Sequence, residues 1–297
     1  MSSRSGEAIG FIGLGVMGEP ICRNLAAKSG RRILGFDLRP EALERLSAYG
    51  VAAAADTGEI ARECEIIFLS LPSGAQVGEV CDGPNGLIAR LRQDQVLVDM
   101  STSPFDLAQR LGAAAVARGG AFADAPIART RQAAEEGTLS IMVGADAATF
   151  ARIAPLLAHC GTDVTHCGPV GSGQVVKILN NMVLVETVVA LAEALAIARR
   201  AGVDGQVLFD TLAKGSADSF ALRNHGMKAM LPGLFPERAF SSAYARKDLD
   251  YALGLAAHVG VGADAARYAH GLLTASIERG DGDLYWPVIA RVVDVEA

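Results

Sequence analysis

The sequence predicts an α/β protein, in which a doubly wound parallel sheet is followed by a second domain made only of helices. Up to about residue 168, short apolar runs alternate with helical patterns, which is typical of a parallel sheet covered on both faces. After residues 168–171, with the sequence Gly-Pro-Val-Gly, no strand pattern follows. The length of 297 residues fits two domains, which we predict at 1–168 and 169–297.

Each predicted element follows from a local pattern. Short apolar runs predict buried strands, and apolar residues at helical spacing predict the helices between them. Pro40 stands in the favoured first turn of a helix over 40–48, and Ser103 is expected to cap a helix over 104–117. The strands are predicted at 8–13, 32–37, 65–71, 95–99, 121–125, 138–143 and 163–167, and the other helices at 16–28, 173–201, 204–213, 218–230, 243–259 and 263–279.

Composition and charge argue against several kinds of partner. The chain is 51% hydrophobic but only 5% aromatic, as expected of a helix-rich globular protein. Its net charge of -6 disfavours nucleic acid and anionic membrane surfaces. Residues 1–8 lack the apolar core of a signal peptide, and Glu186 and Glu193 interrupt the apolar run over 182–198, which favours a buried helix over a membrane span. We therefore expect a cytoplasmic protein.

The cysteines predict reduced thiols. The chain has 5 of them, an odd number, with no C-x-x-C pair. The pairs His159-Cys160 and His166-Cys167 leave a zinc site open as an alternative, but their spacing matches no common zinc finger, and a glycine follows each pair. We interpret them as turn residues and predict no metal.

A nucleotide-binding motif opens the chain. Gly13-Leu14-Gly15-Val16-Met17-Gly18 is a G-x-G-x-x-G sequence between a predicted strand and a predicted helix, and Asp37 closes the next strand. This context is that of the Rossmann dinucleotide-binding fingerprint. Gly13 allows the tight turn, Gly15 lets the pyrophosphate approach the backbone, and Gly18 lets helix and strand pack closely. The alternative, a plain strand-to-helix turn, does not explain Asp37.

Asp37 indicates which cofactor is bound. A carboxylate there can accept hydrogen bonds from the 2′-hydroxyl of the ribose and repels a 2′-phosphate, so we prefer NAD. Arg39 lies two positions on and could reach a phosphate, so NADP stays possible. Two later strand ends are expected in the same crevice, one at Leu71-Pro72 and one at Ser101-Thr102-Ser103. The alternative for each is an ordinary capped loop.

Lys177 and Asn181 are the candidate chemical residues. They begin the long predicted helix, and a spacing of four places both on one helix face. An amine can accept and return a hydroxyl proton if its pKa is lowered from its usual value of about 10.4. The amide can hold a substrate. The alternative is a solvent-facing lysine, the usual location of this residue type.

With these residues in place, the chain resembles the β-hydroxyacid dehydrogenase family, which includes 3-hydroxyisobutyrate dehydrogenase, tartronate semialdehyde reductase and sulfolactaldehyde reductase. The resemblance covers essentially the whole chain. It depends on four segments in order, at 10–18, at 124–126 continuing to 137–139, at 171–181, and at Lys247-Asp248.

The resemblance implies a role for several residues. Lys177 would be the acid/base, Asn181 a substrate ligand, and Lys247 a contact near the nicotinamide. It also implies an all-helical second domain and an active site in the cleft between domains. The cofactor-contacting positions of the family are matched by Leu71, Pro72, Gln76 and Thr102.

The chain departs from the family pattern in the substrate loop. Many members have Ser-Gly-Gly where this chain has Ala128, Arg129 and Thr130. An Arg-Thr pair resembles the sulfolactaldehyde reductase branch, and a guanidinium can bind a carboxylate or sulfonate with two donors. We predict that Arg129 and Thr130, with Ala128 and Ser101, contact the substrate. The alternative is a surface arginine. Tyr285 replaces an aspartate of many members, and the sequence suggests no reason for the change.

The sequence therefore predicts an NAD(P)-dependent oxidoreductase that interconverts a small anionic β-hydroxy acid and its semialdehyde. The first alternative is a reductase of sulfolactaldehyde or a succinic-semialdehyde-like acid, with Arg129 on the anionic tail. Imine reduction is disfavoured because related imine reductases usually lack the lysine. An alternative of another class is a nucleotide-binding protein without catalysis. The long apolar helix favours a homodimer or homotetramer.

Overall fold

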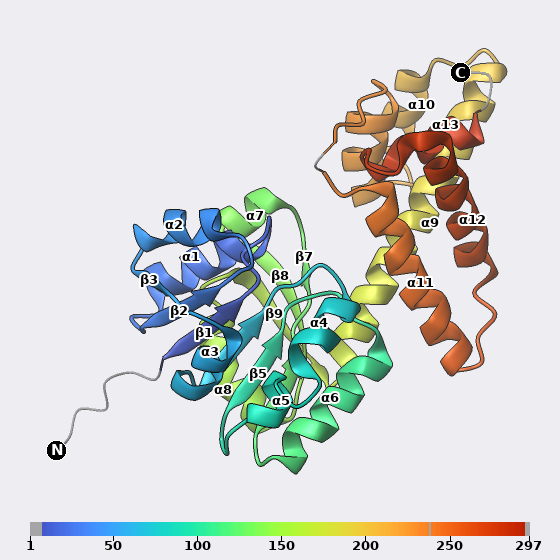
Figure 1. The fold of residues 1–297 in the computed structure, drawn as a ribbon. Coiled ribbons are helices and arrows are strands. Elements are labelled where there is room, and N and C mark those ends of the chain that lie inside the picture. The colour runs from blue at the N-terminus through green and yellow to red at the C-terminus, as the bar shows by residue number, and fades with distance from the viewer. Residues whose placement is uncertain (1–7, 238, 295–297) are drawn as a thin grey trace. The chain divides into compact units, whose positions relative to one another are not determined.

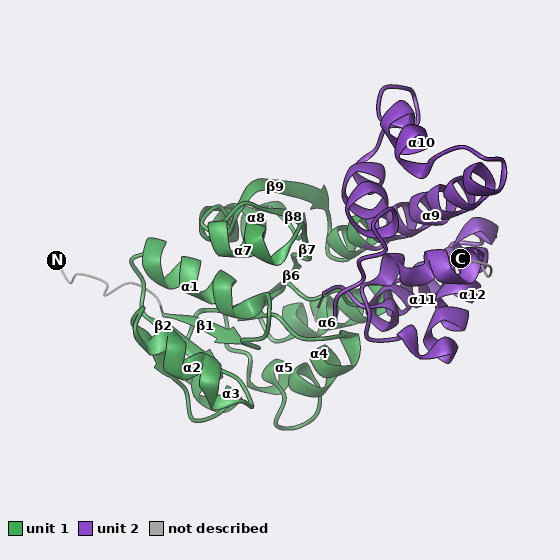
Figure 2. Ribbon diagram, turned by 90° about the horizontal axis from the view of Figure 1, so that it is seen from above, with its two compact units in different colours: residues 1–177 green, residues 178–297 purple. Residues whose placement is uncertain are grey.

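The computed structural model describes residues 8–237 and 239–294. It contains two compact units, Met1–Lys177 and Ile178–Ala297 (Figure 2). The boundary between the two compact units lies inside helix α9 (Ser172–Arg200). The start of α9 belongs to the first unit, where its backbone is hydrogen-bonded to Asp124.

The first unit contains a nine-stranded sheet with helices on both faces (Figure 1). The strand order is β3-β2-β1-β4-β5-β6-β8-β7, and β9 pairs with β8. Every pairing from β3 to β6 is parallel, whereas β8 runs antiparallel to β6 and β7. The strands are β1 (Ile9–Ile12), β2 (Ile33–Phe36), β3 (Val51–Ala53), β4 (Ile66–Leu69), β5 (Val96–Asp99), β6 (Ala121–Asp124), β7 (Ile127–Ala128), β8 (Leu139–Gly144) and β9 (Gly161–Gly168).

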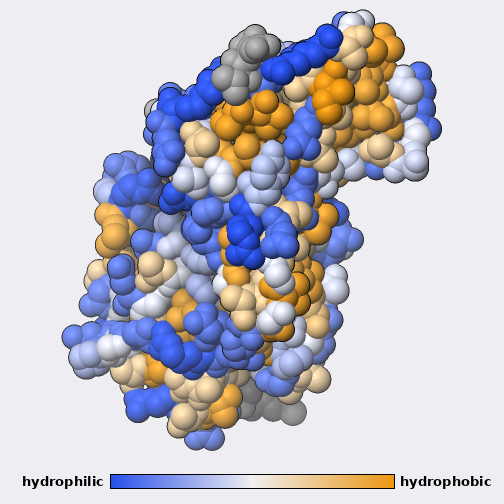
Figure 3. Space-filling view, turned by 90° about the vertical axis from the view of Figure 1, so that its right-hand side faces the viewer, coloured by the Kyte–Doolittle hydropathy of each residue, from blue (hydrophilic) through white to orange (hydrophobic). Residues whose placement is uncertain are grey.

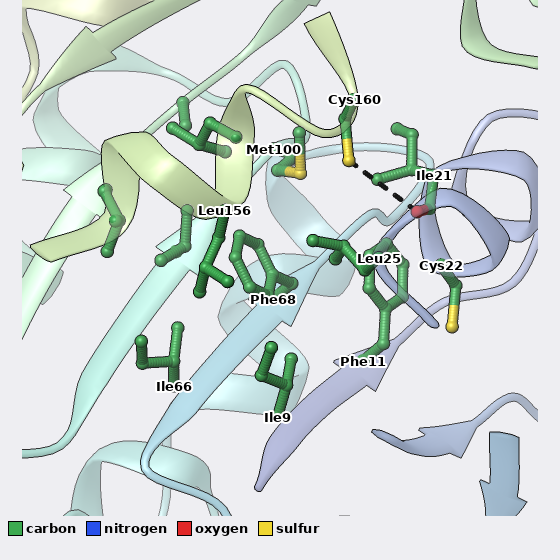
Figure 4. Close-up of a cluster of buried hydrophobic side chains, with 14 of the residues drawn as sticks. Ile9, Phe11, Ile21, Cys22, Leu25, Ile66, Phe68, Met100, Leu156 and Cys160 are labelled. Atoms are coloured by element: carbon green, nitrogen blue, oxygen red, sulfur yellow. Dashed lines mark hydrogen bonds between the residues drawn. The ribbon is translucent and has the colours of Figure 1, made fainter. Parts of the chain in front are cut away.

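Parallel strands bury both of their faces here. Along β4, Ile66 and Phe68 belong to one core cluster, whereas Ile67 and Leu69 belong to the cluster on the other face. Figure 4 shows the first cluster, in which Phe68 lies among aliphatic side chains of the strands and helices. The helices that cover the sheet are α1 (Gly18–Lys28), α2 (Pro40–Ser47), α3 (Thr57–Glu63), α4 (Gly74–Cys81), α5 (Leu87–Arg90), α6 (Phe105–Ala117), α7 (Arg131–Glu136) and α8 (Ala147–Leu157).

One predicted cap was wrong. The residue before α6 is Pro104, which makes no side-chain cap hydrogen bond. Ser103 instead donates its hydroxyl to Asp99 at 2.7 Å. Asp99 is almost fully buried, and a buried carboxylate needs such donors, so the tertiary partner replaces the local one.

The second unit is helical, as the sequence predicts, and within its described residues the only β pairing consists of two isolated bridges. Its core forms around α9, where apolar residues such as Ile178, Val188 and Leu195 are buried. By length and composition α9 could also cross a membrane, but half of its most apolar window is buried inside the protein. The other helices are α10 (Gly205–Leu212), η1 (Leu222–Met230), α11 (Ser242–His258), α12 (Asp264–Ser276), η2 (Ile277–Asp281), η3 (Trp286–Ile289) and α13 (Ala290–Val293).

Candidate active site

The glycine-rich loop between β1 and α1 lets other groups approach its backbone closely. Gly13 has φ +92°, a conformation that side chains rarely adopt, and a Cβ there would lie 2.3 Å from Ser70 O. A Cβ on Gly18 would lie 2.0 Å from Gly13 O, so helix and strand can pack only with glycine here. At Gly15 the space is open: apart from its chain neighbours, the Arg39 guanidinium is the one group of the described residues within 4 Å of an added Cβ. The loop thus leaves its backbone accessible to a pyrophosphate.

Asp37 lies directly beside this loop. Its carboxylate accepts a hydrogen bond from Leu14 N–H at 2.6 Å and another from Arg39 N–H at 2.9 Å. The Arg39 guanidinium lies 3.6 Å from the same carboxylate and is mostly exposed. The structure therefore brings the glycine motif together with Asp37, the predicted ribose ligand, and with Arg39, the cation that could bind a 2′-phosphate.

The ends of β4 and β5 are joined by side chains. Leu71 N–H donates to Ser101 Oγ at 2.9 Å. Asp99 accepts from Ser101 N–H at 2.9 Å, and burial raises its pKa to about 6 although the hydrogen bonds from Ser101 and Ser103 oppose that shift. Thr102 is half-buried between them. Leu71 and Ser101, a predicted cofactor position and a predicted substrate position, are thus joined in one hydrogen-bond network at the carboxyl edge of the sheet.

Gln76 lies in the first turn of α4, after Pro72. The Ser73 hydroxyl donates to Gln76 Oε1 and accepts from Ala75 N–H at 3.2 Å, so it caps the helix. The capping serine therefore orients the Gln76 amide, and both follow directly after β4 in the same strand-to-helix turn.

The predicted substrate loop has an unexpected geometry at Arg129. Its φ is +84°, and its guanidinium contacts Thr138 O, Thr162 Oγ1 at 2.9 Å and the Asp163 carboxylate at 2.6 Å. Ala128 ends β7, and Thr130 is the N-cap of α7. In this conformation the arginine is paired along the edge formed by β8 and β9, so a substrate anion would have to compete with Asp163.

Lys177 and Asn181 lie one turn apart on α9, and both are largely buried, with exposed fractions of 9% and 6%. Asn181 donates its amide to Asp248 Oδ2 at 2.6 Å. The other carboxylate oxygen of Asp248 lies 3.1 Å from Lys247 Nζ. Asp248 therefore joins two predicted site residues, a role that the Lys247-Asp248 segment gave no means of assigning.

Aromatic rings surround Lys247 in the same unit. Its Nζ lies 5.4 Å from the ring centroid of Tyr244 and 5.1 Å from that of Tyr251. Rings at this distance attract a cation through their faces. Together with Asp248, they orient the ammonium group from several directions.

Tyr285, which had no explanation from the sequence, has a partner in the structure. Its hydroxyl lies 2.5 Å from His225 Nδ1, and His225 also contacts the rings of Phe220 and Trp286. Burial lowers the pKa of His225 to about 4 and raises that of Tyr285 to about 12, so both are neutral near pH 7.

The histidine and cysteine pairs have structural partners. Cys160 is buried and donates to Ile21 O (Figure 4), and His166 contacts Ala145 O at 2.8 Å while stacking on Phe150. Among the described residues, no group of three or more His, Cys, Asp or Glu side chains could hold a metal ion. Burial raises the pKa of Cys64 and Cys160 to about 12, which keeps these thiols protonated.

Two sequence families match the chain. The family described as the NAD binding domain of 6-phosphogluconate dehydrogenase matches residues 8–168. The family described as NAD-binding of NADP-dependent 3-hydroxyisobutyrate dehydrogenase matches residues 171–291. Together they span both units.

Individual relatives agree with these matches. The chain is 36% identical over 245 residues to 2-(hydroxymethyl)glutarate dehydrogenase of Eubacterium barkeri, covering 82% of this chain and 81% of the relative. It is 36% identical over 253 residues to 3-hydroxyisobutyrate dehydrogenase of Pseudomonas aeruginosa, covering 82% and 84%. The solved structure of Mycobacterium tuberculosis 3-hydroxyisobutyrate dehydrogenase with L-serine superposes with a TM-score of 0.86 at 30% identity, covering 98% of this chain and 99% of that one.

Proposed function

The chain belongs to the β-hydroxyacid dehydrogenase family and is an NAD(P)-dependent oxidoreductase that acts on CH–OH groups, and from this premise we propose that Lys177 is its acid/base. The observation that supports this role is the place of Lys177, largely buried on the first turns of α9, one turn from Asn181. An amine held in one place within reach of a hydroxyl group can exchange a proton with it.

The residues of this chain divide the reaction between them. When bound, the nicotinamide cofactor supplies the hydride acceptor or donor. Lys177 Nζ takes the hydroxyl proton during oxidation of the alcohol and returns it to the carbonyl oxygen during reduction. We propose that Asn181, oriented by Asp248, binds the substrate and that Lys247 is a contact for the cofactor. The Gly13–Gly18 loop would hold the pyrophosphate, and Leu71, Pro72, Gln76 and Thr102 would be the further cofactor contacts.

The cofactor that we propose is NAD, with NADP as the weaker ligand. The Asp37 carboxylate faces the loop and would repel a 2′-phosphate. Exchange of Asp37 for alanine should raise the Kd for NADH by at least tenfold and leave that for NADPH unchanged or lower. Exchange of Arg39 for alanine should raise only the Kd for NADPH. Fluorescence titration measures both, and tighter NADPH than NADH binding by the unaltered protein would contradict the preference.

The substrate that we propose is a small anionic β-hydroxy acid, interconverted with its semialdehyde in the cytoplasm. The names of two relatives, 3-hydroxyisobutyrate and 2-(hydroxymethyl)glutarate dehydrogenase, describe acids that carry a hydroxymethyl group on the carbon next to a carboxylate. Ser101, Ala128 and Thr130 are the further residues that we place around the acid.

The alternative is a substrate with a strongly anionic tail, such as sulfolactaldehyde or a succinic-semialdehyde-like acid, held by Arg129. This requires the guanidinium to leave Asp163. Exchange of Asp163 for asparagine weakens that ion pair, and in this alternative it lowers KM for the anionic substrate. If exchange of Arg129 for alanine left kcat/KM for the best substrate unchanged, Arg129 would have no part in binding.

The first experiment measures absorbance at 340 nm with both cofactors on a panel of 3-hydroxyisobutyrate, glycerate, tartronate semialdehyde, succinic semialdehyde, 4-hydroxybutyrate and sulfolactaldehyde. The unaltered protein is compared with Lys177→Met and with Lys177→Arg, which keeps the charge but cannot release its proton near pH 7. We expect both variants to lose at least 100-fold in kcat. A matched control is Lys214→Met, an exposed lysine of the helical unit, which should keep full activity.

A further inference from the structure

Asp124 caps α9 from outside the helix. Its carboxylate at the end of β6 accepts hydrogen bonds from Gly171 N–H at 2.6 Å and from Gln174 N–H at 2.8 Å. Amides at a helix N-terminus have no partner within the helix, and a carboxylate there also interacts favourably with the helix dipole. The start of α9 is therefore bound to the central sheet by a buried side chain.

Gln174 provides a second attachment. Its side chain is fully buried, and its Oε1 accepts from Ser103 N–H at 3.0 Å while its Nε2 donates to Ser101 O at 2.8 Å. Ser101 in turn accepts from Leu71 N–H. The same amide thus links α9 to the ends of β5 and β4, where the cofactor-contacting positions lie.

The fit around this attachment leaves no room for the helix to shift. A Cβ on Gly173 would lie 2.4 Å from Met142 O and 2.8 Å from Asp124 Oδ2, distances that real Cβ atoms do not show. The helix can neither rotate nor slide here without losing these contacts. Lys177 follows three residues after Gln174, one turn further along the same helix.

We propose that Asp124 and Gln174 are positioning residues, which fix the first turn of α9 and thereby the place of the Lys177 amine. The inference rests on the proposed acid/base role of Lys177. A displacement of about 1 Å at a catalytic group can cost on the order of 100-fold in rate, so an anchor next to the lysine controls turnover without touching the substrate.

The chain offers a matched control for Gln174. Gln95 is equally buried, and its side chain also binds backbone groups of two segments, accepting from Arg92 N–H at 2.6 Å and donating to Ala61 O at 2.7 Å. It precedes β5, at the opposite end of that strand. Exchange of either glutamine for methionine removes the same kind of hydrogen bonds from a buried site, but only Gln174 is attached to α9.

Two quantities are measured on Gln174→Met, Asp124→Asn and Gln95→Met. The first is kcat and its pH profile. The second is the rate of Lys177 acetylation and its pH dependence. It is measured with a limiting amount of an amine-reactive acetylating reagent and followed by peptide mass spectrometry. We expect the Gln174 and Asp124 variants to lose at least tenfold in kcat and to change the pH dependence of Lys177 acetylation. Gln95→Met should lose comparable thermal stability but keep the kcat and the Lys177 acetylation profile of the unaltered protein.

The outcomes separate this inference from the proposed function. A shifted Lys177 titration in a protein that turns over no substrate supports the positioning role and contradicts the proposed chemistry. Equal kcat and equal Lys177 labelling in Gln174→Met and Gln95→Met would overturn the positioning role. If Gln174→Met fails to fold, Asp124→Asn still tests the positioning role. Asparagine has the same shape as aspartate but can accept only one of the two hydrogen bonds that cap α9.

Discussion

Arg129 occupies a backbone conformation that glycine adopts more easily. Its φ of +84° places a Cβ in the left-handed region, at a position where the family resemblance has glycine. The backbone of the loop thus keeps the conformation expected of a glycine although the residue changed. The side chain offsets part of the strain through its contacts with Thr162 and Asp163, but an ion pair exposed to solvent contributes little to stability.

This strain predicts an order of stability between two variants. Arg129→Gly should be more stable than Arg129→Ala by about 1 kcal/mol, because both lose the ion pair and only alanine keeps the strained Cβ. Urea denaturation measures the difference. At Gln132, an exposed residue within α7, the order should reverse, because alanine favours the helix. An Arg129→Ala variant as stable as Arg129→Gly would show that the loop carries no strain.

His225 predicts a pH dependence of folding. Burial lowers its pKa from 6.5 to about 4, so the folded state binds a proton more weakly than the unfolded state. The stability that His225 contributes is therefore present above pH 6.5 and is lost as pH falls toward 4, by up to roughly 3 kcal/mol. In His225→Gln the loss of unfolding free energy between pH 7 and pH 4.5 should be smaller than in the unaltered protein. Equal losses, measured by urea denaturation at both pH values, would contradict the assignment.

Helices and strands were predictable where their patterns were long. The predicted fold class is confirmed, and the strands that position the nucleotide site lie within one or two residues of their predicted bounds. The sequence did not predict β3 and β7, because segments of three and two residues carry no periodicity. It also did not predict that η1 is a π-helix, because its residues have the spacing of any amphipathic helix.

Two helical glycines predict opposite effects of the same substitution. At Gly254, within α11, no atom of the described part of the chain lies within 4 Å of an added Cβ, apart from its own helix backbone. Gly254→Ala should therefore stabilise the protein by about 0.5–1 kcal/mol through helix propensity. Gly173, in the first turn of α9, would place its Cβ against Met142 O, so Gly173→Ala should destabilise it by about 1–3 kcal/mol and lower kcat. Thermal melts measure the stability of the two variants, and turnover assays measure their kcat. Two substitutions of the same sign would show that the space around Gly173 adapts.

The predicted site residues came from motifs, whereas their supporting residues came only from the fold. A glycine spacing indicates Gly13–Gly18, and a helical spacing of four indicates Lys177 and Asn181. The hydrogen bonds of Asp124, Gln174 and Asp248 join residues that are 47 to 73 positions apart in the sequence. No local sequence pattern encodes such a pairing. Physical chemistry explains their need, because buried carboxylates and amides require partners, but only the tertiary structure identifies those partners.

The surface of the helical unit predicts self-association. Large apolar side chains remain exposed on α9, with Val183 at 56% and Ile197 at 68%, and Figure 3 shows hydrophobic groups gathered on a face of this unit. Extended apolar surface of this kind marks interaction sites, and we propose a homodimer or homotetramer. Val183→Glu should reduce the mass measured by light scattering to that of a single chain.

A matched control tests whether this effect is specific. Val116 is exposed to 69% on α6 of the nucleotide-binding unit, and Val116→Glu should leave the assembly intact. An unaltered protein with the mass of one chain, 30.8 kDa, at every concentration would contradict the proposal. An assembly that survives Val183→Glu would place the contact on another face. A dissociated Val183→Glu protein that keeps its kcat would show in addition that each chain carries a complete site.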